Sequence, residues 1–123
     1  MAERVASCSC GLLRVTCRSE PRLVSLCHCL QCQRQTGSTY GVAAFFLKQD
    51  VVISGASGLF TRQSDTGFAV EQHFCPNCGS TVFWFPSRKP DMVAVAVGAF
   101  ADPGFPAPGQ SVHREARHHW INF

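Results

Sequence analysis

The chain has 123 residues, 46% of them apolar and 15% charged, a composition that predicts one globular domain over residues 1–123. No stretch approaches the ~18 consecutive apolar residues of a membrane helix, and the opening sequence MAERVAS lacks a signal-peptide core. We therefore expect a protein of the reducing cytoplasm with no membrane partner. The formal charge is +3, and the basic side chains are scattered rather than gathered with aromatics, which argues against a nucleic-acid partner.

The hydrophobic pattern predicts many short strands in chain order and little helix. The expected strands cover residues 12–17, 23–29, 40–47, 51–53, 58–62, 68–74, 80–85 and 92–98. The two strands around the turn sequence SDTG are expected to form a hairpin. Residues 101–109, ADPGFPAPG, predict an irregular loop, and the tail 111–123 fits either a closing strand or a packed tail. Only residues 30–35 and the tail are candidates for a short helix, so the predicted fold class is mainly β.

Eight cysteines are the most informative feature of the composition. In a secreted chain such a number would indicate disulfides, whereas in a cytoplasmic chain it more often indicates metal binding or catalysis. The cysteines are Cys8, Cys10, Cys17, Cys27, Cys29, Cys32, Cys75 and Cys78.

The sequence CPNCG places Cys75 and Cys78 on a tight turn, where both thiols can face one zinc ion. A structural zinc takes four ligands, and Cys8 and Cys10 can supply the other two. In an extended strand, residues two apart point to the same side, so these two thiols would converge. A redox dithiol is the alternative for the later pair, but residues 80–85 indicate a strand where redox pairs use a helix. A buried apolar thiol pair is the alternative for the earlier one.

Cys27, Cys29 and Cys32 form a C-x-C-x-x-C trio, with the first two on one face of the expected strand. His28 would then point the other way. Three protein ligands and one open position are what a catalytic zinc needs, and the open position would accept water or a thiol. Two alternatives remain: a zinc site closed by a distant residue such as Cys17 or a histidine, and a metal-free trio that oxidises.

The remaining thiol and most histidines are expected to pack or to face solvent rather than to react. Cys17 is expected to be a small buried apolar residue. Trp84 and Trp120 are expected in the core or in a pocket wall. The histidines of this group are His73, His113, His118 and His119.

Three motifs follow one another along the chain: SCSCG at residues 7–11, CHCLQCQRQTGS at 27–38 and FCPNCGST at 74–81. In this order and spacing the chain resembles the glutathione-dependent formaldehyde-activating enzyme (GFA) family, also named for centromere protein V. The resemblance covers essentially the whole domain. It implies a β-tent fold, in which several small antiparallel sheets are pinned by a structural zinc. That fold is shared with a Rab-binding accessory of guanine-nucleotide exchange.

The resemblance also implies a reaction and a division of the cysteines. The implied activity is the condensation of glutathione with formaldehyde to S-hydroxymethylglutathione, classed in reverse as a carbon–sulfur lyase. Two zinc ions are implied, one structural and one catalytic, and the catalytic ion is the more easily lost. The implied catalytic residues, which also hold the second ion, are Cys27, Cys29 and Cys32, and the structural ligands are Cys8, Cys10, Cys75 and Cys78.

Gln33, Arg34 and Gln35 directly follow the trio, and we predict that they bind carboxylates or amides of the peptide thiol. The sequence singles out no general base. The alternative to an enzyme is a non-enzymatic zinc module that binds another protein, as the exchange-factor accessory does. A nucleic-acid zinc ribbon is disfavoured, because the chain has one C-x-x-C-G knuckle and not two.

Overall fold

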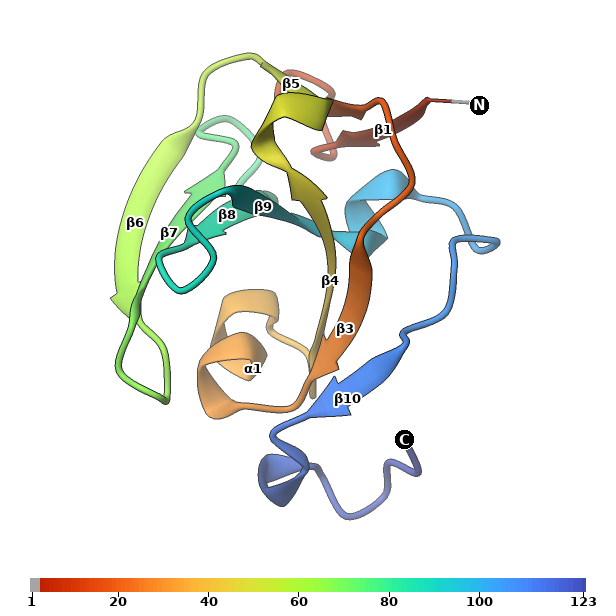
Figure 1. Cartoon of the computed structure of the whole chain (residues 1–123). Helices are drawn as coiled ribbons and strands as arrows, with labels where there is room; N and C mark the ends of the chain where they lie inside the picture. Colours follow the sequence, from red (N-terminus) through yellow and green to blue (C-terminus); the bar gives the residue numbers. More distant parts are fainter. Residues whose placement is uncertain (1–2) are drawn as a thin grey trace.

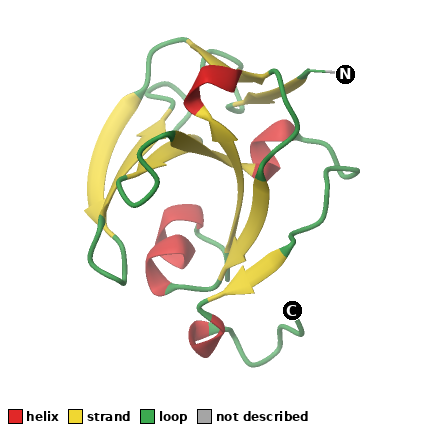
Figure 2. Cartoon of the chain, in the orientation of Figure 1, coloured by secondary structure: helices red, strands yellow, loops and turns green. Residues whose placement is uncertain are grey.

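The structure is a computed structural model that describes residues 3–123, and strands dominate it (Figure 2). The smaller of its two sheets is antiparallel, with the strand order β1-β2-β5. These strands are β1 (Arg4–Ser7), β2 (Arg14–Cys17) and β5 (Val51–Ser54).

The larger sheet has seven strands in the order β10-β3-β4-β9-β8-β7-β6 and curves around the space that holds the helix α1 (Figure 1). All neighbours are antiparallel except β10 and β3, which are parallel. Its strands are β3 (Leu23–Cys27), β4 (Gly41–Leu47), β6 (Gly58–Gln63), β7 (Ala69–Phe74), β8 (Thr81–Pro86), β9 (Met92–Ala96) and β10 (Gln110–Val112).

The helices are short. The α-helix α1 (Leu30–Thr36) begins at Cys29, whose sulfur accepts a hydrogen bond from the Cys32 amide, and ends at Gly37. Gly37 has φ 68°, a left-handed conformation that favours glycine and closes the helix. Within residues 3–123, no helix has the length and apolar character needed to cross a membrane. The 3₁₀ turns are η1 (Lys48–Asp50), η2 (Val97–Phe100) and η3 (Arg114–Ala116).

The larger sheet packs differently on its two faces, because successive strand residues point to opposite sides. On β4, Ala44 and Phe46 are fully buried in the main core, which the smaller sheet also joins through residues such as Val15. The neighbours Ala43 and Phe45 belong to a smaller apolar cluster on the other face. A cleft lies on that second face, and it contains the candidate site.

The mainly β prediction is confirmed by the two sheets, and the helix expected at 30–35 is α1. The hairpin expected around SDTG is formed by β6 and β7. The tail supplies β10, which extends the larger sheet beside β3. Strand β1 was not predicted, because its sequence RVAS has too few residues to show a periodic pattern.

Two local predictions about cysteine positions are wrong. Cys8 and Cys10 do not lie on one extended strand: they belong to a turn in which the Gly11 amide donates to the Cys8 carbonyl at 3.2 Å. Gly11 has φ 85°, which permits that turn. The strand expected to reach Cys29 ends at Cys27, because Cys29 caps the helix instead. A turn brings the Cys8 and Cys10 sulfurs together, and the junction of a strand with a helix brings those of the trio together.

Candidate metal centres and the adjoining cleft

Four sulfur atoms converge where β1 and β2 meet the turn between β7 and β8. The sulfurs of Cys8, Cys10, Cys75 and Cys78 all lie within 4.8 Å of one another. The distances from the Cys10 sulfur to those of Cys8 and Cys75 are both 3.6 Å. Four ligands at about 2.3 Å around a tetrahedral zinc would be about 3.8 Å apart. The quartet therefore fits a single zinc ion.

The backbone around the quartet favours thiolates, the form that binds metal. The Leu13 amide donates to the Cys8 sulfur at 3.2 Å, and the Asn77 amide donates to the Cys75 sulfur at 3.4 Å. The Ser80 hydroxyl, 3.4 Å from the Cys78 sulfur, and nearby backbone amides lower the pKa of Cys78 to about 5. These hydrogen bonds stabilise negative charge on the sulfurs, which favours binding of a metal cation.

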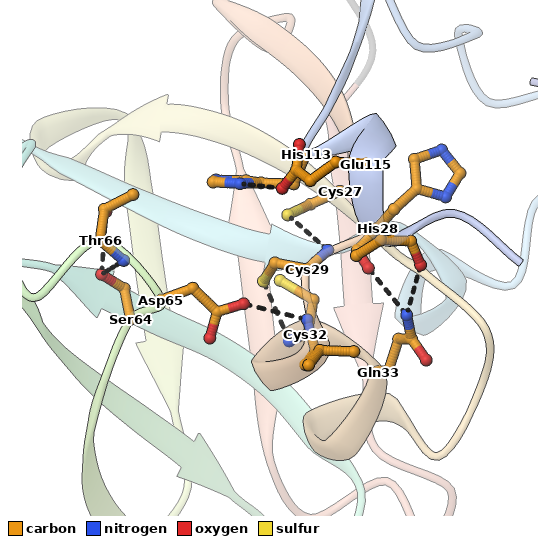
Figure 3. Close-up of polar contacts among 12 residues, drawn as sticks. Cys27, His28, Cys29, Cys32, Gln33, Ser64, Asp65, Thr66, His113 and Glu115 are labelled. Atoms are coloured by element: carbon orange, nitrogen blue, oxygen red, sulfur yellow. Dashed lines mark hydrogen bonds and ion pairs between the residues drawn. The ribbon is translucent and has the colours of Figure 1, made fainter.

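The trio lies at the junction of β3 and α1 (Figure 3). Cys27 ends the strand, Cys29 caps the helix and Cys32 sits in its first turn. Their sulfurs lie within 4.8 Å of one another, and no other Cys, His, Asp or Glu of residues 3–123 joins the set. In the described part of the chain the eight cysteines are all free thiols. The trio thus presents three converging sulfur donors that could hold a metal ion.

The three thiols of the trio share their protons unequally. Hydrogen bonds from the Cys27 and Cys32 side chains place the pKa of Cys29 far below its ordinary value. Side-chain hydrogen bonds with Cys27 and then Cys29 raise the pKa of Cys32, and the hydrogen bond with Cys29 raises the pKa of Cys27 to about 11. The backbone amide of Cys32, 3.2 Å from the Cys29 sulfur, supports the negative charge there. The trio therefore carries thiolate character at its most buried member.

A cleft of about 410 Å³ opens in front of the trio, and all three cysteines line it. Its floor is the second face of the larger sheet, where Ala43 and Trp84 leave an apolar surface. A cleft of this size suits a small-molecule ligand. The trio is therefore accessible on one side, in contrast to a closed structural site.

The chain matches the family model described as "Glutathione-dependent formaldehyde-activating enzyme" over residues 3–121. The chain belongs to the GFA family. A Halomonas elongata protein named "Putative glutathione-dependent formaldehyde-activating enzyme" is 31% identical over 114 residues, which cover 87% of this chain and 71% of that protein. A crystal structure of a Rhodobacter sphaeroides protein has a TM-score of 0.58 and 22% identity, covering 87% of this chain and 98% of the other. That likeness shows the fold alone.

Gln33 is the first residue after the trio, and its side-chain amide forms hydrogen bonds within the protein. Its nitrogen donates to the His28 carbonyl at 2.8 Å and to the Ala116 carbonyl at 3.2 Å, and its oxygen lies 2.9 Å from Nε2 of His118. Gln33 therefore ties α1 to the tail. His28 itself is fully buried, with Nε2 3.0 Å from the Ser111 hydroxyl, and it is not part of the trio.

The other two predicted substrate-binding residues differ in position. Arg34 is exposed and is not among the residues that line the GFA cleft. Gln35 does line it, and its side-chain oxygen accepts hydrogen bonds from Arg62 Nε at 3.1 Å and Nη2 at 2.8 Å. Of these three residues, Gln35 is the one that lines the cleft.

The cleft contains polar side chains that sequence reasoning missed. Arg62, Arg88, Lys89 and His113 all line it, although they come from three distant segments. Their one sequence signal is weak, since Arg88 and Lys89 form a basic pair in the turn expected between two strands. Nothing local ties any of them to the trio, and only the folding of the larger sheet brings them there.

Proposed function

We propose that this GFA-family protein is an enzyme that adds a thiol, glutathione by family likeness, to a small aldehyde such as formaldehyde. The product is an S-hydroxymethyl adduct, and the reverse reaction is that of a carbon–sulfur lyase. The observation that carries the proposal is the trio itself: three converging sulfurs with no fourth ligand group in the described chain, open to a cleft of about 410 Å³.

The two cysteine sets suit two zinc ions with different roles. The quartet would hold a structural zinc, and Cys27, Cys29 and Cys32 would hold a catalytic one. Bound in the trio, zinc supplies a Lewis acid that lowers the pKa of an incoming thiol. The trio offers one ligand fewer and lies at a cleft, so its ion is the one expected to be lost first.

The addition moves one proton and one electron pair. The carbon–sulfur bond forms from the thiol sulfur, the carbonyl π pair moves onto the aldehyde oxygen, and the thiol proton ends on that oxygen. His113 lines the cleft, and its Nδ1 lies 3.3 Å from a carboxylate oxygen of Glu115 (Figure 3). That contact favours the tautomer with the proton on Nδ1 and a lone pair on Nε2. His113 is therefore suited to accept the thiol proton and return it to oxygen.

The activity is tested by exchange NMR on glutathione and formaldehyde at equilibrium, which measures interconversion with the adduct above the uncatalysed rate. The zinc-loaded protein should raise the exchange rate, and Cys32→Ser should abolish the increase while retaining the wild-type circular dichroism spectrum. Cys17→Ala is the matched control, since it removes a buried thiol outside both cysteine sets. Equal rates with and without protein, or full activity of Cys32→Ser, would refute the proposal.

A second candidate is a non-enzymatic zinc module that binds another protein. One observation favours it: Leu59 and Phe60 are 55% and 58% exposed on β6, the edge strand of the larger sheet. Exposed apolar residues on an edge strand can pair with a partner. Under this function Leu59→Ser would abolish partner capture and Cys32→Ser would not, and no exchange rate would be raised.

A further inference from the structure

The turn between β8 and β9 places two cations at one end of the cleft. Arg88 and Lys89 both line the cleft. The Arg88 guanidinium lies 5.8 Å from the ring centroid of Phe68, and the Lys89 ammonium lies 5.4 Å from that of Phe45. These aromatic contacts hold both charges over the apolar wall. The two cations are therefore directed over the cleft by their packing.

The cleft carries an excess of positive charge. Neither Arg88 nor Lys89 forms a salt bridge with a carboxylate among residues 3–123. Arg62 donates two hydrogen bonds to the neutral side-chain amide of Gln35 and forms no salt bridge among residues 3–123. The one carboxylate that lines the cleft, Asp65, accepts a hydrogen bond from the first amide of α1 at 3.1 Å. Three cationic side chains and one carboxylate thus line the cleft. An anionic ligand would neutralise the excess positive charge.

The strand register shows how far apart along β4 the trio and the Lys89 contact lie. Gly41 pairs with Cys27 at the trio end of β4, and Phe45, beneath Lys89, lies four residues further along the strand. Four residues of strand span about 13 Å. A ligand that contacts both the trio and Lys89 must therefore extend along the floor of the cleft. A single amino acid is too short to bridge the two ends.

We propose that Arg88 and Lys89 bind a carboxylate of the thiol substrate, so that the cleft selects thiols that carry a carboxylate remote from the sulfur. This inference rests on the proposed function, because it takes the trio as the place of the sulfur. Between the two ends the ligand passes over Ala43 and Trp84, which suits the methylene groups of a flexible peptide side chain. The selecting feature is the distant carboxylate, and the apolar floor adds contact area.

The test measures binding separately from chemistry. Isothermal titration calorimetry on zinc-loaded protein uses S-methylglutathione, whose sulfur is blocked, and its dimethyl ester, which lacks both carboxylates. The wild type should bind the acid more tightly than the ester. The double variant Arg88→Gln/Lys89→Gln should weaken binding of the acid by about tenfold and no longer distinguish it from the ester. Arg14→Gln, an exposed arginine of the smaller sheet, is the matched control and should bind like the wild type.

The outcomes separate this inference from the proposed function. Unchanged affinity of the double variant, equal binding of acid and ester by the wild type, or no binding of either compound would overturn the carboxylate anchor. Circular dichroism of the double variant shows that a loss of affinity is not a loss of fold. Exchange NMR on the wild type reports the reaction by itself, so the anchor can fail while catalysis stands, or the reverse.

Discussion

Replacing one ligand in each cysteine set should have unequal effects on folding, and the chain topology gives the size of the difference. The Cys10 and Cys75 sulfurs are 3.6 Å apart although 65 residues separate them. A cross-link that closes a loop of this length removes chain entropy worth about 4 kcal/mol at 25 °C. The trio spans only the six positions from Cys27 to Cys32, for which the same relation gives about 2 kcal/mol.

Domains of this size are stable by roughly 5–15 kcal/mol, so loss of the quartet's ion removes a large share of the total. We expect Cys75→Ser to lower the melting temperature of the zinc-loaded protein by on the order of 10–20 °C. Cys29→Ser should lower it by about half as much or less, because its cross-link is local. Differential scanning calorimetry with zinc counted per chain provides the measurement. Equal decreases in melting temperature, or a larger decrease for Cys29→Ser, would refute the division into a structural quartet and a functional trio.

Three further predictions concern residues around the two sites. His113→Gln should slow the exchange between glutathione and its adduct by about a hundredfold, with an unchanged melting temperature, if His113 carries the proton. Gln33→Ala should lower the free energy of unfolding by about 1–3 kcal/mol, since two carbonyl groups lose their donor, and limited proteolysis should cut the tail faster. Burial raises the pKa of Cys17 from its ordinary value of 9.0 to about 12, so iodoacetamide at pH 8 should label it only after unfolding. The folded thiol then keeps its proton where the unfolded one ionises, and the free energy of unfolding should decrease as pH rises from about 9 to 12.

The turns and helix that carry the cysteines were largely predictable from local sequence. Residues 30–35 were expected to be helical, and α1 begins directly after its cap Cys29. The knuckle at Cys75 and Cys78 was expected to be a tight turn, and Gly79 closes it with φ 83° and a 2.8 Å hydrogen bond to the Cys75 carbonyl. Such features depend on hydrogen bonds between residues a few positions apart, which is why a short motif specifies them.

The role of residues next to the trio was harder to predict, because sequence proximity does not give direction. Gln33, Arg34 and Gln35 are consecutive on α1, where each residue is rotated by about 100° from the last. Only Gln35 lines the cleft, while Gln33 faces the tail and Arg34 faces solvent. One short helix thus separates three adjacent candidates into three environments.

By itself, the sequence determined the seven sulfur donors and their grouping into pairs and a trio, because metal-ligand spacing depends on the reach of a few residues of backbone. Only the tertiary structure decided what surrounds the trio. Arg88, Lys89 and His113 reach the same cleft because β10, β3, β4, β9 and β8 are neighbours in one sheet. That strand order arises from pairing between segments far apart in the chain, so no local pattern encodes it.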